Sequence, residues 1–277
     1  MTVLVIGGSG QIGQFLLPRL ADAGADILAV SRRPPPADPR WLAGALPDAM
    51  PELPAVDAVI SLGPLDHLAP WLSATRLAGT PHVIATSSMS AETKRDSDVP
   101  EERELSRRLR DAETTLIATC ASRGMPWTLF RPTLIYGAGV DKSLTPIVQA
   151  ALRRRVFPIP AGRGQRQPVH AEDIAAAIMA ALGSPFARGH TFPIGGGERM
   201  SAAEMFRRVR RSAGGPTLPA PIPRLALDLA ALVSPALRGP IRRLDSDLIA
   251  DNRELERVLG VHPRPFHPGP ETWRPMR

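Results

Sequence analysis

The sequence has few of the residues on which several classes of site depend. A single cysteine, Cys120, excludes an internal disulfide and a metal cluster held by several cysteines, and it suits a reducing compartment. Tyr136 is the only tyrosine of the 277-residue chain, and Lys94 and Lys142 are its only lysines. Any mechanism that needs a tyrosine beside a lysine must therefore use these three residues.

Long hydrophobic runs are also missing. The most apolar late stretch, Leu225 to Leu237, is interrupted by Asp228 and Pro235 and is shorter than the roughly 20 residues that a bilayer span needs. The apolar N-terminal residues follow no basic segment and lead directly into glycines, which argues against a signal peptide. We therefore expect a globular, cytoplasmic protein without a transmembrane segment or a metal site.

Positive charge is in excess. The 34 lysines and arginines against 27 aspartates and glutamates give a net charge of +7. The arginine clusters, such as Arg153 to Arg155, are scattered along predicted helices without interleaved aromatic residues or a known nucleic-acid motif. This pattern favours solvated helix faces over nucleic-acid binding. The oligomeric state stays open.

Segments of strand and helix type alternate along the first half of the chain. Thr2 to Ile6 predicts a strand, Gly7 to Gly13 a turn, and Gln14 to Ala23 an amphipathic helix. Strands that alternate with helices predict a parallel sheet. Further strands are expected at Asp26–Ser31, Val56–Leu62, His82–Ser87 and Trp127–Arg131, and further helices at Leu65–Ala78 and Pro100–Arg123.

The sequence therefore predicts an α/β protein of two parts. Residues 1–140, with returning segments near 156–195, should form a Rossmann-type domain that binds a dinucleotide, with a parallel sheet and helices on both of its faces. Residues 141–277 turn into helices with short strands and prolines between them. They should form a smaller, mostly helical C-terminal lobe that binds the substrate.

Glycines at the first strand-to-helix turn predict a dinucleotide site. Gly8, Gly10 and Gly13 match the G-x-G-x-x-G spacing, and Gly7, Gly10 and Gly13 match G-x-x-G-x-x-G. Glycine lets the backbone approach a pyrophosphate closely, and the N–H groups at the start of the next helix meet its negative charge. A tight turn without a ligand is the alternative, which the position between strand and helix disfavours.

The end of the second predicted strand bears on the choice of cofactor. An acidic residue usually holds the adenosine ribose hydroxyls there, but this chain has Ser31, Arg32 and Arg33. Guanidinium groups can clamp a 2′-phosphate. The sequence therefore favours NADP, with NAD as the alternative if both arginines are ordinary loop residues.

Five later segments, taken in order, resemble one family. The resemblance is to the short-chain dehydrogenase/reductase superfamily, in its extended, epimerase/dehydratase-like branch. It covers nearly the whole chain, because the stretch from Asp251 to Phe266 is similar to the C-terminal signature of that branch. The five segments are Asp57–Gly63, His82–Ser88, Phe130–Gly137, Gly164–Asp173 and Thr191–Gly197.

Carried over by position, the resemblance implies three groups of cofactor contacts. The pyrophosphate would lie against Gly7, Gly10, Gln11, Ile12 and Gly13. The adenine and its ribose would lie against Ser61, Leu62 and Gly63. The nicotinamide would lie against Pro132, Thr133 and Leu134.

The resemblance also implies a place for the chemistry. Ser87 and Ser88 lie where the family has its active-site hydroxyl, although serines that simply end a strand are the alternative. Arg166 matches the arginine that grips a substrate phosphate in nucleotide-sugar members, with a surface arginine as the alternative. His170 and Asp173 should cap and position the helix that follows them.

The family's usual acid/base pair is absent. A tyrosine normally transfers the proton and a lysine four residues later lowers its pKa, yet the predicted helix from Pro100 to Arg123 has neither residue type. Tyr136 follows another strand, where it either contacts the substrate or packs at the hinge between the lobes. Glu102 or Glu104 is a candidate substitute base, though carboxylates beside arginines at helix spacing are typical of a solvated face.

Two functions follow from this reasoning. The first is an atypical oxidoreductase or epimerase-like enzyme in which Ser87, Ser88 or a water moves the proton and the cofactor supplies the hydride chemistry. Its small-molecule substrate is unidentified, and Arg166 favours a phosphorylated or nucleotide-linked one. The second is a sensor, regulator or assembly factor that binds NADP without turnover.

The late segment from Pro219 to Arg243 carries a separate hypothesis. It contains proline-bounded apolar helices flanked by arginines. Such a segment could cover a hydrophobic substrate pocket or contact a membrane surface or a partner. Packing onto the small lobe is the alternative.

Overall fold

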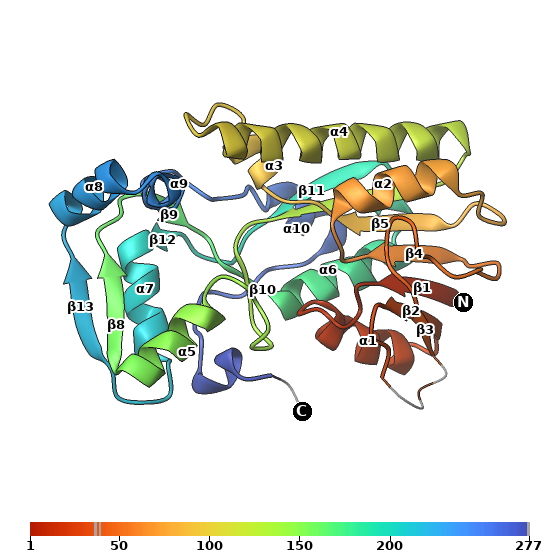
Figure 1. Ribbon diagram of the computed structural model, residues 1–277. Coiled ribbons are helices and arrows are strands. Elements are labelled where there is room, and N and C mark those ends of the chain that lie inside the picture. The colour runs from red at the N-terminus through yellow and green to blue at the C-terminus, as the bar shows by residue number, and fades with distance from the viewer. Residues whose placement is uncertain (36–37, 39, 276–277) are drawn as a thin grey trace.

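A seven-stranded parallel sheet forms the centre of the larger lobe in the computed structural model, which describes residues 1–35, 38 and 40–275 (Figure 1). The strand order is β11-β6-β5-β4-β1-β2-β3, and every neighbouring pair is parallel. This confirms the predicted Rossmann-type α/β fold. The strands are β1 (Thr2–Ile6), β2 (Asp26–Ser31), β3 (Trp41–Ala43), β4 (Ala58–Ser61), β5 (His82–Thr86), β6 (Trp127–Pro132) and β11 (His190–Ile194).

Helices cover both faces of this sheet because its side chains alternate between two cores. Val3 and Val5 of β1 pack with α1 (Gly13–Asp22) and α6 (Ala171–Gly183) on one face. Leu4 and Ile6 of the same strand pack on the other face, with α2 (Leu65–Ala74) and α4 (Pro100–Ser122). The short helix α3 (Ser90–Thr93) lies beside α4.

In the large lobe, one predicted helix end was wrong and one strand was not predicted. The helix that begins at Leu65 ends at Ala74, not at Ala78. Its end is fixed by the Arg123 guanidinium, which donates hydrogen bonds to the carbonyl oxygens of Leu72, Ser73 and Thr75 at 2.6–2.7 Å. The edge strand β3 was not predicted, because a run of three residues is too short to show a strand period on its own.

The smaller lobe is built on a separate core. Tyr136, Phe157, Phe266 and Trp273 are buried in it. Its helices are α5 (Thr145–Arg154), α7 (Ala202–Arg211), α8 (Arg224–Val233) and α9 (Pro235–Arg243). Its strands form three pairs, β7 (Ile135–Tyr136) with β10 (Val169–His170), β8 (Val156–Pro160) with β13 (Leu218–Ile222), and β9 (Gln165–Arg166) with β12 (Met200–Ser201).

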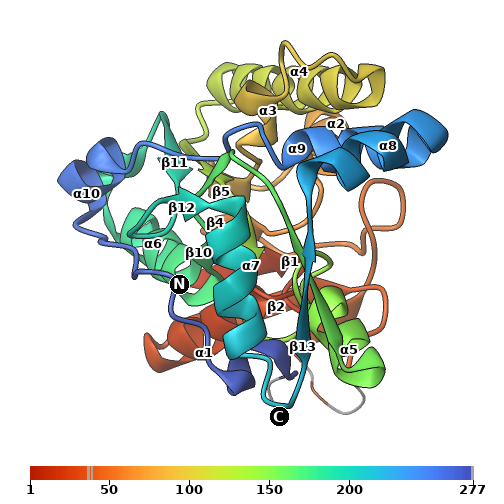
Figure 2. The same cartoon turned by 90° about the vertical axis from the view of Figure 1, so that its left-hand side faces the viewer.

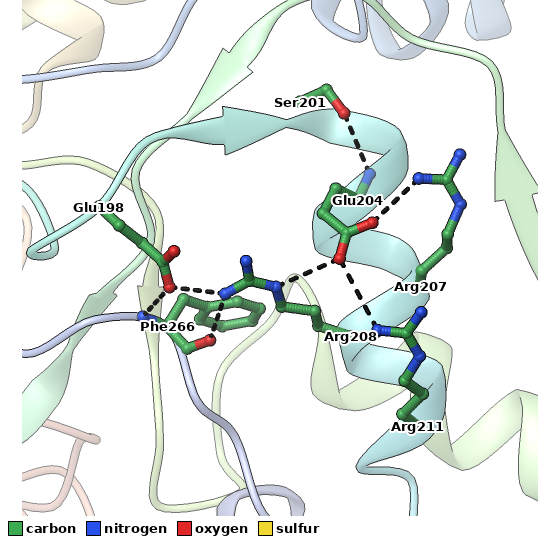
Figure 3. A network of polar contacts seen from close by, with 7 residues as sticks. All are labelled: Glu198, Ser201, Glu204, Arg207, Arg208, Arg211 and Phe266. Atoms are coloured by element: carbon green, nitrogen blue, oxygen red, sulfur yellow. Dashed lines mark hydrogen bonds and ion pairs between the residues drawn. The ribbon is translucent and has the colours of Figure 1, made fainter.

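The C-terminal segment runs back across both lobes. Helix α10 (Arg253–Leu259) packs against α6 and β11 of the large lobe, and the single helical turn Pro270–Trp273 packs against α5. Between them, Glu198 accepts hydrogen bonds from the Phe266 amide at 2.8 Å and from Arg208 at 2.6 Å (Figure 3). Arg208 thereby ties α7 to the C-terminal segment.

None of the helices within the described residues combines the length and the apolar character needed to cross a bilayer.

Candidate functional site

Two of the predicted cofactor segments lie at the point where the strand order of the sheet reverses. Strand β1 lies between β2 and β4, so the chain moves outward on one side to β3 and returns on the other through β4, β5 and β6. The carboxyl ends of these strands define the crevice in which proteins of this topology bind a nucleotide. The glycine turn after β1 and the Ser61–Gly63 segment after β4 both lie there.

The glycine turn requires glycine for steric reasons. A Cβ on Gly13 would stand 2.0 Å from the carbonyl oxygen of Gly8, so a side chain there would push the turn apart. Gly7 adopts a φ of +81° and lies so close to the next loop that a Cβ would be 3.2 Å from the Gly63 amide. Helix α1 begins at Gly13 without a side-chain cap. The amides of Gln14, Phe15 and Leu16 already donate to the carbonyl oxygens of Gly10 and Ile12, so the N–H groups open to an anion are those of Ile12 and Gly13.

Buried polar atoms at the same edge fit a dinucleotide. Among the described residues, the Gln11 Oε1 and Ser61 Oγ atoms are buried and have no hydrogen-bond partner. Buried polar groups normally have one. Both residues belong to the predicted cofactor set, so the phosphates and ribose of a bound dinucleotide would supply the partners.

The end of β2 carries unopposed positive charge. The Arg33 amide donates to Ser31 Oγ at 3.2 Å, which fixes the turn, and the side chains of Arg32 and Arg33 are exposed. Within residues 1–35, 38 and 40–275, no carboxylate forms an ion pair with either arginine. These arginines are available to an anionic ligand at the adenosine end of the crevice.

The predicted nicotinamide residues adjoin the serine turn after β5. The Met89 amide donates to the Pro132 carbonyl oxygen at 2.9 Å, which brings the Ser87–Ser88 turn beside the end of β6. Thr133 is buried, and its hydroxyl donates to the carbonyl oxygen of Gln167. Leu134 packs against the core of the small lobe. The structure therefore brings these residues and both candidate serines together.

Ser87 belongs to a buried polar network that the sequence analysis missed. Its hydroxyl donates to Glu113 Oε1 at 2.5 Å, and Arg131 Nε donates to the same oxygen at 2.9 Å. Arg131 also donates to Glu113 Oε2 and, at 2.8 Å, to Glu92. These hydrogen bonds, led by those to Glu113, raise the pKa of Arg131. The Ser87 proton is thus directed at Glu113 and away from the crevice.

A signal for this network does exist in the sequence. Glu113 stands between Ala112 and Leu116 on the stripe of α4 that faces the core, and Arg131 interrupts an otherwise apolar strand. A charged residue in a segment that should be buried indicates that it has a partner, but it does not identify that partner.

Ser88 has a different environment from Ser87. It is half-buried, and its Oγ accepts a hydrogen bond from the Ser90 amide at 3.1 Å, where α3 begins. Since this bond uses the oxygen as an acceptor, the hydroxyl proton remains available for donation. Of the two candidate serines, Ser88 is the one whose hydroxyl proton has no acceptor among the described residues.

Tyr136 lies in the core of the smaller lobe. Its ring packs edge-on against His170, with centroids 5.0 Å apart, and against Phe266, at 4.8 Å. It is 2% exposed, and burial raises the pKa of its hydroxyl far above the ordinary value. This environment matches the hinge-packing interpretation.

Of the two residues predicted to cap α6, His170 does so and Asp173 does not. His170 Nδ1 accepts from the Glu172 amide at 3.2 Å and caps α6. Asp173 does not cap the helix, because its carboxylate binds the backbone amide and the Nε of Arg264 at 3.0 and 2.8 Å. Asp173 instead fastens the C-terminal segment to α6.

The predicted phosphate-binding arginine is already engaged. Arg166 is buried and donates to the carbonyl oxygens of Gln165 and Ser246 at 2.9 and 2.6 Å, and to that of Arg243. It holds the end of α9 against β9. A substrate phosphate would have to share its guanidinium with these carbonyls.

The candidate substitute bases also have partners. Glu102 accepts from Ser97 Oγ at 2.8 Å and lies 3.5 Å from both Lys94 Nζ and Arg243 Nε. Glu104 is exposed and binds Arg107. The pair of Glu102 with Arg243 joins α4 of the large lobe to α9 of the small lobe.

A cavity of about 1080 Å³ lies within the small lobe. Its walls come from the ends of β8 and β13 and the first turns of α7 and α8. Apolar and basic residues dominate the lining, including Ile159, Ile222, Arg163 and Arg207. None of the predicted cofactor residues contributes to it.

Two curated relatives are named as reductases. The chain is 28% identical over 228 residues to an NAD(P)H azoreductase of Xenophilus azovorans, and the match covers 77% of this chain and 74% of that one. It is also 28% identical over 232 residues to a (4-alkanoyl-5-oxo-2,5-dihydrofuran-3-yl)methyl phosphate reductase of Streptomyces griseus, with the same two coverages.

A solved structure shares the fold over nearly the full chain. MoeE5 in complex with UDP-glucose and NAD superposes with a TM-score of 0.72 at 21% identity, covering 99% of this chain and 97% of that one.

These matches bear out the expected superfamily, its fold and its class of oxidoreductase and epimerase-like enzymes that use a nicotinamide dinucleotide. The substrate is not identified by them. A sequence profile of the NAD dependent epimerase/dehydratase family matches residues 3–69 and 71–195, which is well over half of the chain. The chain belongs to the NAD dependent epimerase/dehydratase family.

Proposed function

We propose that this protein is an NADPH-dependent reductase of a small molecule with an electron-poor double bond. The observation that carries the proposal is the contrast along one sheet edge. The nucleotide side keeps a glycine-only turn and unpartnered buried polar atoms at Gln11 and Ser61. The proton-transfer side has no tyrosine–lysine pair on α4, and a Glu113–Arg131 pair lies beneath Ser87.

The missing pair favours reduction over epimerisation. Epimerisation of a sugar through its ketone begins with removal of a hydroxyl proton, which requires a positioned base. Bound NADPH supplies a hydride by itself. An acceptor whose reduced anion is stabilised by conjugation can then take its proton from Ser88 or from water. Both curated relatives matched over three quarters of the chain are named reductases, which supports this choice.

Within this proposal, each group of residues has a role. Gly7, Gly10, Gln11, Ile12 and Gly13 bind the pyrophosphate, and Ser61, Leu62 and Gly63 bind the adenosine. Pro132, Thr133 and Leu134 flank the nicotinamide, and Ser88 donates the proton. Ser87 positions the turn that carries Ser88.

The small lobe would bind the substrate. Its cavity combines apolar walls with Arg163 and shares no residue with the predicted cofactor set, so it would hold an end of an amphipathic substrate, such as a phosphate, that lies away from the reacting bond. Tyr136 and Arg166 would support the cavity by fixing the hinge and the end of α9, since both are buried behind it.

NADP preference is the sharpest test of the cofactor proposal. Dissociation constants for NADPH and NADH would be measured by fluorescence for the wild type, for Arg32→Ala with Arg33→Ala, and for the control Arg76→Ala. Arg76 is also exposed but lies after α2. We expect the double variant to lose about 100-fold in NADPH affinity and to keep its NADH affinity. Equal affinities of the wild type for both cofactors would refute the preference.

Turnover is tested separately from binding. NADPH oxidation would be followed with azo dyes, quinones and unsaturated lactones, and UDP-sugars would be assayed for epimerisation. We expect oxidation with at least one of the first three classes, and Ser88→Ala should slow it about 100-fold. Tight NADPH binding without turnover on any class would instead identify the non-catalytic sensor or regulator.

A further inference from the structure

The far end of the small lobe exposes an unusual row of apolar side chains. Five of them, on β13 and α8, are 54–85% exposed. Exposed prolines of β13 lie between Leu218 and α8, and Figure 2 shows α8 leading off at an angle from the upper end of β13. We call this row the β13–α8 strip, formed by Leu218, Pro219, Pro221, Leu225, Leu229, Leu232 and Val233.

Helix α8 presents its leucines on one side. Leu225, Leu229 and Leu232 follow helical spacing, so they share a face. Leu227, which points the other way, is buried. The helix therefore packs on the lobe through Leu227, and folding of this chain leaves its outer apolar face uncovered.

Arginines without acidic partners border the strip. The Leu218 amide donates to the Arg155 carbonyl oxygen at 2.9 Å, so the arginine run Arg153–Arg155 adjoins the first residue of the strip. Arg238 borders the other end. In the part of the chain that the structure describes, these four arginines form no ion pair. No acidic residue occurs between positions 145 and 163 or between 205 and 227.

The neighbouring helix α7 shows that this charge is not typical of the lobe. There, Glu204 binds Arg207 at 3.0 Å, Arg208 at 3.3 Å and Arg211 at 3.7 Å (Figure 3). On the strip, the carboxylate of Asp228 is taken up by Arg224. Arg207, Arg208 and Arg211 on α7 thus have a carboxylate partner, whereas the arginines at the ends of the strip have none among the described residues and remain available to an external anion.

The same features argue against a second copy of the chain as the occupant. A twofold contact through the strip would bring unpaired arginines of like charge toward each other. Pairing through the edge of β13 is also blocked. Leu218 turns its amide to β8, so by alternation the outward amides belong to positions 219 and 221, and both are proline.

We propose that the β13–α8 strip docks reversibly on an anionic lipid surface. The leucines would lie at the boundary of headgroups and acyl chains, and Arg153, Arg154, Arg155 and Arg238 would contact lipid phosphates. This surface lies apart from the predicted cofactor residues, so docking leaves cofactor binding intact.

Co-sedimentation with vesicles tests the proposal on the full chain. Vesicles of phosphatidylcholine alone are compared with vesicles in which phosphatidylserine makes up about a third of the lipid. We expect binding only to the second kind, and less of it as salt rises. No binding to phosphatidylserine vesicles at low salt overturns the proposal.

Matched variants locate the contact. Leu229→Ser with Leu232→Ser should weaken binding about tenfold or more, and Arg153→Ala with Arg154→Ala about fivefold for each arginine. Phe186→Ser and Arg257→Ala remove an exposed aromatic residue and a paired arginine elsewhere, and both should bind as the wild type. Circular dichroism and NADPH affinity report whether each variant is folded. Binding that the strip variants leave unchanged contradicts the proposal, as does a dimer in sedimentation that only these variants dissociate.

Discussion

At the carboxyl edge of the sheet, the glycine turn after β1 and the serine turn after β5 differ in whether their polar groups have hydrogen-bond partners. The glycine turn leaves buried atoms of Gln11 and Ser61 without partners and α1 without a cap. At the serine turn, Ser87, Glu113 and Arg131 satisfy one another. In our proposal, the side with unpaired polar groups accommodates the dinucleotide, and the side that pairs them contributes to stability.

Gly13→Ala tests the nucleotide side and has the largest expected effect. The added Cβ would stand within 2.5 Å of three backbone atoms of Gly8, which cannot move without opening the turn. We expect NADPH affinity to fall by about 1000-fold or more. Gly183→Ala is the control, because a Cβ there has no neighbour within 4 Å. If Gly13→Ala bound NADPH normally, the turn would not be the cofactor site.

The nucleotide side could be predicted from the sequence because its determinants are local. Gly7, Gly10 and Gly13 act through their own backbone and lie within one strand-to-helix turn. The α/β order was readable for the same reason, since β1, α1 and β2 each carry their own hydrophobic period.

The proton-transfer side could not be predicted because its determinants are distant in the chain. Glu113 meets Ser87 across 26 positions and Arg131 across 18, and no spacing rule links them. Likewise Arg123 ended α2 early through contacts about 50 residues away. The absence of the tyrosine–lysine pair was visible, but the pair of charges beneath the serine turn was not.

Glu113→Gln tests whether the serine side is organised for stability. Removing the charge leaves Arg131 with Glu92 as its only carboxylate partner, and because Arg131 keeps that partner and is 20% exposed, the cost should be about 2 kcal/mol, less than for a fully buried pair. We expect the free energy of unfolding in urea to fall by about that amount, with NADPH affinity unchanged. Glu104→Gln, at an exposed pair with Arg107, should leave stability unaltered. If folded Glu113→Gln lost NADPH affinity, the serine turn would take part in cofactor binding, and the two turns would not have separate roles.

At the opposite edge of the sheet, His82 at the start of β5 should make the stability of the protein depend on pH. Burial, with a further effect from Arg188, lowers the pKa of His82 to about 4. Below the ordinary value of 6.5 the unfolded chain binds the proton first, so stability should fall between pH 6.5 and 4, by about 3 kcal/mol in total.

His82→Gln should remove most of this pH dependence while keeping a hydrogen bond to Thr128. Urea unfolding at several pH values measures it. Burial lowers the pKa of His170 as well, so a smaller loss of the same sign should remain. If His82→Gln lost as much stability between pH 6.5 and 4 as the wild type, another group, such as His170, would be responsible for the pH dependence. The contrast between the two turns would then be weaker.

Ser87→Ala has the smallest expected effect and separates the two serines. Its hydroxyl donates to a carboxylate that Arg131 already binds on both oxygens, so its removal should cost about 1–2 kcal/mol of stability. The proton of Ser87 points to Glu113, so the rate of NADPH oxidation per folded molecule should stay within about twofold of the wild type. Ser88→Ala should show the reverse, with little change in stability and a slower rate. If Ser87→Ala abolished turnover in a folded protein, Ser87 and Glu113 would have to take part in proton transfer. The serine turn would then have a catalytic role and not only a stabilising one.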